Sequence, residues 1–289
     1  MSVGTPLVLA LALALTGAAP SGLAGHFALA TGAPRTAARL VASPVANDAL
    51  ARRLDIAYTA GGNVVRRYDV DMTKLLHLIV VDDAFRSFAH VHPPLAPSGH
   101  VTIEHRFPHP GLYHVYADAA PAQIGQQVFR FDLPVGDARA AGARDVTPTG
   151  RNVAAGPYRV ALDSTSLRAA GESVLRVRVT KNGKLANDLH PYLGALAHAV
   201  FLDAASLAYV HVHPLPPGGG AAVSGTARGH DMPGMPGMQM DAPALPPGAT
   251  SSPVMLLHVA VARPGTYKLW LQFRGGSGLY VAPFVVRAS

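Results

Sequence analysis

The sequence predicts an all-β protein made of two tandem antiparallel β-sandwich domains. Three observations predict this fold class: short segments alternate between apolar and polar residues, no segment keeps a helical period, and one block of sequence occurs twice. The 289 residues are enough for two domains of ordinary size. Apolar residues make up 49% and charged residues only 14%, and the 29 Gly and 25 Pro favour loop-rich β structure over charged helices.

The block that occurs twice carries three histidines at fixed spacing. His77 begins an apolar segment in the first copy, and His198 does so in the second. Each is followed by the same tetrapeptide, His90-Val91-His92-Pro93 and His211-Val212-His213-Pro214, and each His and Pro of the second copy lies 121 positions after its counterpart. A constant offset over a shared motif indicates an internal duplication.

A second shared block extends the repeat. Residues 110–116 and 264–270 share the pattern Pro-Gly-x-Tyr at an offset of 154, so the second copy contains 33 additional residues between the two blocks. Tyr113 and Tyr267 stand where Ig-like sandwiches place a tyrosine corner, in which the hydroxyl bonds back to the backbone upstream. By analogy with those sandwiches, we expect a tyrosine corner in both halves.

Strand signals recur at about 8–12-residue spacing, which is typical of sandwiches of the Ig-like or cupredoxin-like kind. The expected strands are rich in Val, Ile, Phe and Tyr and are separated by Gly, Pro or Asp. They cover residues 54–58, 63–68, 75–81, 87–92, 101–107, 112–117 and 127–133 in the first half, and 158–162, 173–180, 197–202, 208–213, 254–261, 265–273 and 279–287 in the second.

The domain boundaries follow from these segments and from the composition between them. We expect a signal peptide over residues 1–25, a poorly ordered Ala-rich lead-in or a short helix over 26–50, a first β-sandwich over 51–135, a linker over 136–156 and a second β-sandwich over 157–288. The second domain carries the Met/His-rich insert at about residues 215–252.

The N-terminal segment predicts export. Residues 7–15 form an apolar run of nine followed by small residues, which is too short for a membrane span and fits a signal peptide, although no Lys or Arg precedes it. We therefore expect an extracytoplasmic protein, secreted or periplasmic, with an uncleaved membrane anchor as the alternative. The chain has no Cys, so disulfides and thiolate metal sites are excluded.

The three-histidine pattern is typical of a metal site. Because alternate side chains on a strand share a face, His90 and His92 point the same way, as do His211 and His213. If His77 pairs opposite His90 or His92, three imidazoles meet on one face, as a Cu(II), Zn(II) or Ni(II) site requires; a one-residue slip moves His77 to the other face. The alternative is that these histidines pack in the core.

The insert carries a second candidate site. Soft thioethers select Cu(I), and a Pro/Gly-rich loop offers Met side chains no core to fill. The alternative is a low-complexity linker in which Met is incidental. The candidate ligands of the loop are His230, Met232, Met235, Met238 and Met240.

Other polar residues near the motifs are weaker candidates. We expect Asp82, Asp83 and Asp203 to form turns. Four further histidines of the first domain have no counterparts in the second, and we expect surface or accessory roles for them; they are His100, His105, His109 and His114.

At these motifs the chain resembles a group of bacterial exported proteins with tandem His-rich β domains, most of them uncharacterised. The resemblance implies the fold and export rather than an activity. The Met/His-rich loop is similar in composition to those of exported copper-handling proteins. The matching residues are 77–81, 88–93 and 110–118 in the first half and 191–194, His198 and 209–214 in the second.

The sequence favours an extracytoplasmic copper-binding or copper-handling protein, with zinc or nickel as alternative ions. Its partners would be the metal ion and another exported copper-handling or membrane protein. An enzyme is not expected, because catalytic motifs are absent, although a three-His metalloenzyme stays a distant alternative. A structural or adhesive module with packing histidines is the main alternative. Scattered arginines without a basic stripe argue against nucleic-acid binding.

Overall fold

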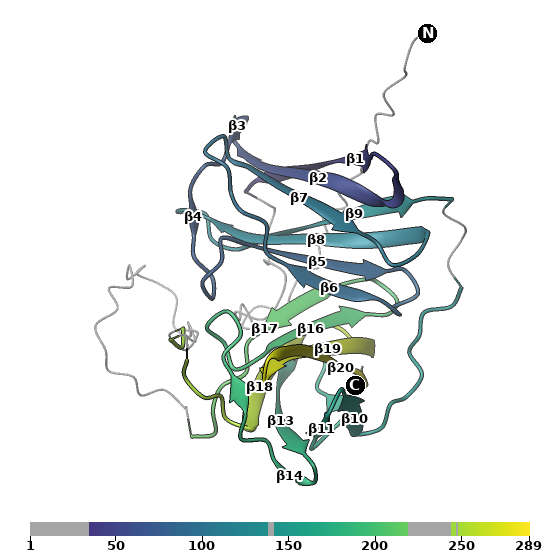
Figure 1. The fold of residues 1–289 in the computed structure, drawn as a ribbon, viewed down its shortest axis with the longest axis vertical. Coiled ribbons are helices and arrows are strands. Elements are labelled where there is room, and N and C mark those ends of the chain that lie inside the picture. Colours follow the sequence, from purple (N-terminus) through teal and green to yellow (C-terminus); the bar gives the residue numbers. More distant parts are fainter. Residues whose placement is uncertain (1–34, 138–141, 219–243, 247) are drawn as a thin grey trace. The chain divides into compact units, whose positions relative to one another are not determined.

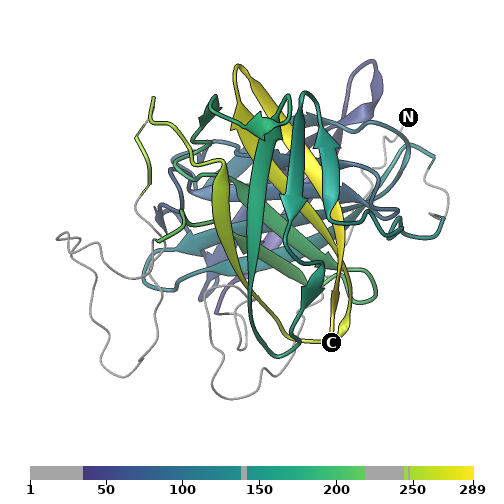
Figure 2. The same cartoon turned by 90° about the horizontal axis from the view of Figure 1, so that it is seen from below.

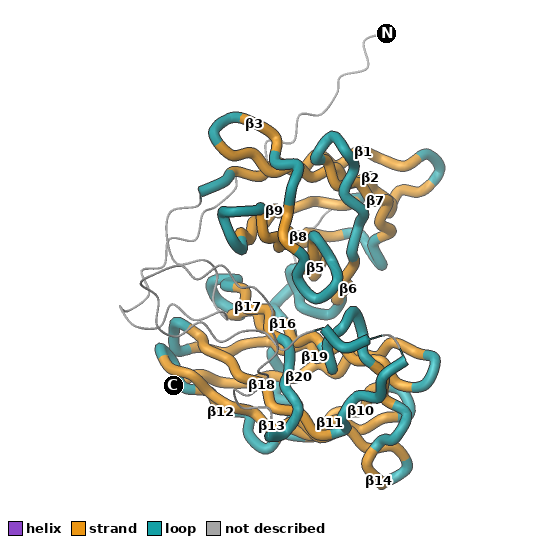
Figure 3. The backbone as a smooth tube through the Cα atoms, turned by 90° about the vertical axis from the view of Figure 1, so that its left-hand side faces the viewer, coloured by secondary structure: helices purple, strands orange, loops and turns teal. Residues whose placement is uncertain are grey.

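The computed structural model describes residues 35–137, 142–218, 244–246 and 248–289. The described residues form strands and loops without a helix (Figure 3). The described residues up to Asp145 form one compact unit, and those from Val146 to Ser289 form the other. The predicted all-β class with two tandem β-sandwich domains is confirmed.

The first unit contains two antiparallel sheets (Figure 1). Alternate side chains of the two sheets meet in one core, which includes Ile56 and Tyr58 from one sheet and Leu78, Tyr113 and Val115 from the other. One sheet consists of β1 (Ala37–Val45), β2 (Asp48–Ala60), β3 (Asn63–Val64) and β7 (His100–Arg106), and the other of β4 (Tyr68–Asp69), β5 (Leu76–Asp82), β6 (Phe88–Val91), β8 (Gly111–Pro121) and β9 (Gln127–Val135).

The second unit repeats this plan (Figures 1 and 2). Its pairs are antiparallel except that β12 runs parallel to β20 over two residues. One sheet consists of β10 (Asn152–Ala155), β11 (Tyr158–Leu162), β13 (Gly171–Lys181), β14 (Lys184–Leu185) and β18 (Val254–Val261), and the other of β12 (Ser166–Leu167), β15 (Leu189–His190), β16 (His198–Asp203), β17 (Tyr209–Val212), β19 (Gly265–Gly275) and β20 (Gly278–Ala288).

A tyrosine corner is present in both units. The Tyr113 hydroxyl, at the start of β8, donates to the carbonyl oxygen of His109 over 2.8 Å. The Tyr267 hydroxyl on β19 donates to the carbonyl oxygen of Arg263 over 2.9 Å. Both bonds span four residues back along the chain, so the analogy with Ig-like sandwiches is confirmed at this position.

Two boundaries of the predicted layout were wrong. The expected poorly ordered lead-in contains β1 and the start of β2, which pair over Ala37–Val45 and turn at Asn47 with φ of 62°. The expected linker ends in β10, which pairs with β11. In both cases a neighbouring strand provides the ladder hydrogen bonds, and weak local β propensity does not reveal such pairing.

The prediction of one strand over residues 63–68 was also wrong, because this segment contains two short strands, β3 and the start of β4. β3 pairs with β2 in one sheet, whereas β4 pairs with β8 in the other. The chain therefore crosses between the two sheets within this segment. An alternating pattern is the same on either side of such a crossing, so periodicity alone could not reveal it.

Candidate metal centres

The strand register decides where the three histidines of the first unit lie. In the β5–β6 pair Ile79 lies opposite His90, which places His77 opposite His92, one residue beyond the end of β6. Leu78 and Val80, which alternate with His77 on β5, point into the sandwich core. The three imidazoles therefore lie together on the face of the sheet that is turned away from that core, as one of the two registers considered from the sequence requires.

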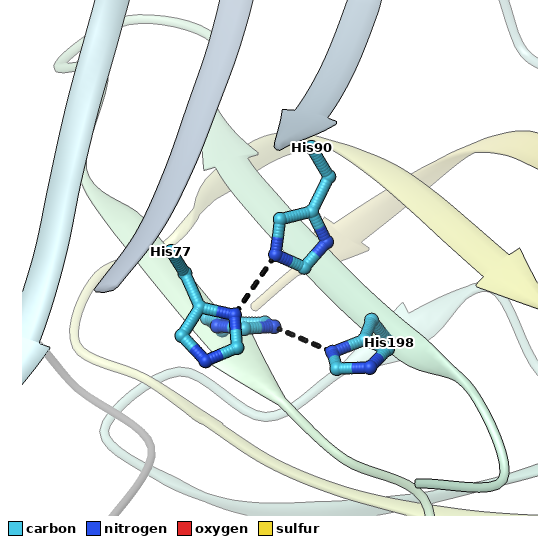
Figure 4. A group of neighbouring side chains, drawn as sticks. His77, His90 and His198 are labelled. Carbon is cyan, nitrogen blue, oxygen red and sulfur yellow. Dashed lines mark hydrogen bonds between the residues drawn. The ribbon is translucent and has the colours of Figure 1, made fainter. Parts of the chain in front are cut away.

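The three rings converge through specific nitrogens. His77 Nδ1 lies 3.0 Å from His90 Nε2 and 3.2 Å from His92 Nε2, and the two Nε2 atoms lie 2.9 Å apart. The rings of His77 and His90 point toward one another in Figure 4. Their side chains are buried, with exposed fractions of 1% and 5%, and His92 is half-buried.

The second unit repeats the arrangement around its first histidine. Val200 of β16 lies opposite His211 of β17, which places His198 opposite His213. His198 Nδ1 lies 3.3 Å from His211 Nε2 and 3.1 Å from His213 Nε2. The rings of His211 and His213 have centroids 4.7 Å apart. The same register and the same nitrogens thus recur in both copies of the duplicated block.

The spacing of these nitrogens fits one bound ion in each cluster. Imidazole nitrogens bind Zn(II) and similar ions at about 2.0–2.1 Å, so two ligands of one ion lie about 2.9 Å apart at a right angle and about 3.3 Å apart at the tetrahedral angle. The measured separations of 2.9–3.3 Å fall in this range. Three imidazoles would leave further coordination positions for water or another ligand.

Each cluster has a backbone partner that was missed in the sequence. His77 Nε2 donates to the carbonyl oxygen of Asp71 over 3.2 Å, and His198 Nε2 donates to that of Tyr192 over 3.0 Å. The Asp71 carboxylate also lies 3.6 Å from His77 Nε2. Asp71 and Tyr192 are themselves 121 positions apart, so extending the repeat upstream of the histidines was the signal that could have found them.

The nearby carboxylates divide into two roles. Asp82 accepts hydrogen bonds from the backbone N–H groups of Arg86 and Ser87, and Asp203 accepts them from Ala205 and Ser206. These two residues are turn formers, as expected. Asp83 differs, because its carboxylate is bound by side chains of neighbouring segments.

His114 was wrongly expected at the surface. It is 2% exposed, and its two ring nitrogens lie 2.7 Å from Asp132 Oδ1 and 2.9 Å from Asp83 Oδ1. Arg144 Nη2 donates to the same oxygen of Asp83 over 2.6 Å. His114 is therefore engaged on both sides of its ring and takes no part in the three-histidine cluster.

The candidate ligands of the Met/His-rich loop are not among the residues that the structure describes. His230, Met232, Met235, Met238 and Met240 lie outside the described residues, as does the N-terminal segment expected to direct export. Among the described residues, no helix has the length and hydropathy that crossing a membrane would need.

Comparison with known proteins gives a family without a known activity. No curated protein matches the chain. A solved structure of FdeC, an Escherichia coli adhesin, is similar at 10% identity and a TM-score of 0.25, over 89% of this chain and 65% of that one. A family described as a domain of unknown function, DUF8832, matches residues 37–136 and 152–289. The matched residues make up most of both β-sandwich units, and the chain belongs to the DUF8832 family.

Proposed function

We propose that this chain is an extracytoplasmic metal-binding protein that binds or handles copper. Each β-sandwich holds one ion through three imidazoles: His77, His90 and His92 in the first unit, and His198, His211 and His213 in the second. The Met/His-rich loop of the second domain adds a site for Cu(I).

The observation that carries this proposal is the triangle of nitrogens in the first unit. Each of the three nitrogens is within hydrogen-bond distance of the other two. A ring nitrogen either carries a hydrogen or presents a lone pair. Each hydrogen bond needs one donor and one acceptor nitrogen. Because three mutually contacting nitrogens share only these two states, at least two of them are in the same state, and the contact between those two is donor against donor or acceptor against acceptor. A cation at the centre removes this conflict, because all three nitrogens then direct lone pairs at it.

Repetition of the cluster argues against simple packing. A packing histidine must fill space and satisfy its polar atoms, which many combinations of residues achieve. Here the second unit keeps three histidines, the same register and the same nitrogens, while other buried positions change; Ile79 of the first unit, for example, corresponds to Val200. Ligation of an ion requires this constancy, whereas packing does not.

The choice of copper rests on ligand chemistry. Neutral imidazole suits Cu(II), Zn(II) and Ni(II), and thioether sulfur selects Cu(I). Copper matches both kinds of ligand found in this chain, imidazole as Cu(II) and thioether as Cu(I). The absence of Cys excludes a blue-copper electron carrier, because that site needs a thiolate.

The test is metal content and metal titration. We expect the exported protein, purified without an affinity tag, to contain copper, and the metal-free protein to bind one Cu(II) ion at each cluster. Replacing His77, His90 and His92 by Ala should remove one of these ions, and replacing His198, His211 and His213 should remove the other.

The matched controls are His100→Ala and His258→Ala, which remove histidines paired with Asp55 and Glu172 outside the clusters. Both control variants should keep full stoichiometry. If the triple variants also keep it, the clustered histidines are packing residues, and the structural or adhesive module becomes the better explanation. If zinc or nickel is found in place of copper, the proposal holds for the sites and fails for the metal.

A further inference from the structure

We propose that two strained turns, residues 71–74 and 192–195, are positioning elements that fix Nδ1 of His77 and of His198 as the atom that faces the metal. The inference rests on the proposed metal-binding function and deepens it. It concerns which ring nitrogen of the first histidine carries the hydrogen, and which one is free to bind, before an ion arrives.

The two turns have the same hydrogen bonds. Asp71 N–H donates to Lys74 O over 2.8 Å, and Lys74 N–H donates to Asp71 O over 2.9 Å. In the second unit, Tyr192 N–H donates to Ala195 O over 2.9 Å, and Ala195 N–H donates to Tyr192 O over 3.1 Å. Each turn is therefore a closed two-residue hairpin loop that ends three residues before the histidine it contacts.

Both central residues of each turn have positive φ. The angles are 41° at Met72 and 71° at Thr73 in the first turn, and 53° at Leu193 and 83° at Gly194 in the second. Turns of this kind favour Asn and Gly, and a β-branched residue such as Thr at positive φ is a strained exception. Such strain persists only where the surrounding structure enforces it, and it is concentrated at functional sites.

What the turns supply is one carbonyl oxygen each. The Asp71 and Tyr192 carbonyls lie 3.2 Å and 3.0 Å from Nε2 of His77 and His198. A carbonyl oxygen only accepts hydrogen bonds, so Nε2 must be the nitrogen that carries the hydrogen. In the neutral ring the lone pair is then on Nδ1, the atom that faces the other two histidines.

The consequence is a preset ligand set of one Nδ1 and two Nε2 atoms. Without the carbonyl, an imidazole can exchange tautomers or turn away, and either change costs binding energy when the ion arrives. Hydrogen-bond partners that orient a metal-binding histidine typically raise metal affinity by about 10–100-fold. The turns therefore act through the histidines and do not touch the ion.

The first experiment reads the tautomer directly in the metal-free protein. Long-range proton–nitrogen NMR correlations distinguish Nε2–H from Nδ1–H in nitrogen-15 histidine, and loss of a signal in His77→Gln or His198→Gln assigns it. We expect Nε2–H at both residues. Observation of Nδ1–H at both would overturn the inference. This measurement requires no metal, so its failure is separate from failure of the proposed function.

The second experiment changes the turn. Thr73 is exposed, and Thr73→Gly keeps access to positive φ, whereas Thr73→Pro fixes φ near −65° and cannot form the turn. We expect Thr73→Gly to bind Cu(II) as wild type does, and Thr73→Pro to lose about 10–100-fold in affinity at the first cluster with the Nε2–H signal of His77 lost.

Retained cooperative thermal unfolding of the first unit reports that the Thr73→Pro protein is folded around the altered turn, since Cu(II) binding at the second cluster reports only on the second unit. Unchanged affinity and an unchanged His77 signal in that variant would show that the turn has no positioning role. If Thr73→Pro does not fold, the tautomer measurement on the wild-type protein decides the inference alone.

Discussion

At the residue scale, Tyr113 and Tyr267 tie the start of a strand to the loop before it. Each hydroxyl donates to a carbonyl four residues upstream, and each ring is buried in the core of its own unit. The Tyr113 hydroxyl also accepts a hydrogen bond from the backbone N–H of His109 at 3.3 Å. These tyrosines therefore combine core packing with the satisfaction of loop polar groups, which Phe cannot provide.

The corresponding prediction is that Tyr113→Phe and Tyr267→Phe each destabilise their own unit by about 1–2 kcal/mol, because a buried hydrogen bond is lost while the ring packing stays. Denaturant unfolding of each variant measures the change. Tyr280→Phe is the control, since its ring contacts Tyr158 and Phe273 but the described residues offer its hydroxyl no hydrogen bond. Equal losses in all three variants would mean that the upstream carbonyls contribute nothing specific.

At the element scale, His114 joins three segments of the first unit. It lies on β8 and contacts Asp132 of β9 and Asp83 of the turn after β5. The hydrogen bond from His114 lowers the pKa of Asp132 below its usual value. Burial raises the pKa of Asp83, but hydrogen bonds from Arg144 and His114 outweigh this effect and leave the pKa lowered.

The pH dependence follows from these shifts. A carboxyl whose pKa is lower in the folded state contributes stability above its unfolded pKa of about 3.9, and that stability is lost as the pH falls through the folded pKa. We expect the melting temperature of the first unit to fall between about pH 5 and pH 2, and Asp132→Asn to flatten this fall. Thermal unfolding followed across this range measures both profiles. Parallel profiles for wild type and variant would mean that Asp132 does not contribute to the acid sensitivity.

At the scale of the whole molecule, the proposed function combines two ligand chemistries. The imidazole clusters belong to the two β-sandwiches, whereas the Met/His-rich loop is an insert in the second domain, close in sequence to His213. A site tethered so near another acts at high effective concentration, so transfer between them would be intramolecular. Imidazole must lose its proton to bind a metal, whereas a thioether has no proton to lose.

We therefore expect acidification through about pH 6.5, where unperturbed imidazole titrates, to weaken Cu(II) binding much more than Cu(I) binding. Replacing Met232, Met235, Met238 and Met240 by Leu should reduce Cu(I) affinity and leave Cu(II) affinity unchanged. Replacing the three histidines of the second cluster should remove one Cu(II) ion and leave Cu(I) affinity unchanged. Titration of the wild type, the Met variant and the His variant with Cu(I) and with Cu(II) measures these changes. Full Cu(I) affinity in the Met variant would show that the loop is only a linker.

The sequence by itself determined the fold class, the duplication and the six clustered histidines. These features are local or periodic: alternation with period two predicts strands, and the constant offset of 121 identifies equivalent positions without any knowledge of contacts. The tyrosine corners were predictable for the same reason, because a short block containing Tyr113 or Tyr267 recurs in both halves.

Only the tertiary structure decided the register that brings His77 to His90 and His92. A one-residue slip of β5 against β6 would leave the sequence pattern unchanged and place His77 on the other face, so the choice depends on which residues fill the core. The turn at Met72 and Thr73 was hidden for a related reason. Neither residue favours positive φ, so the residue preferences give no sign of the turn.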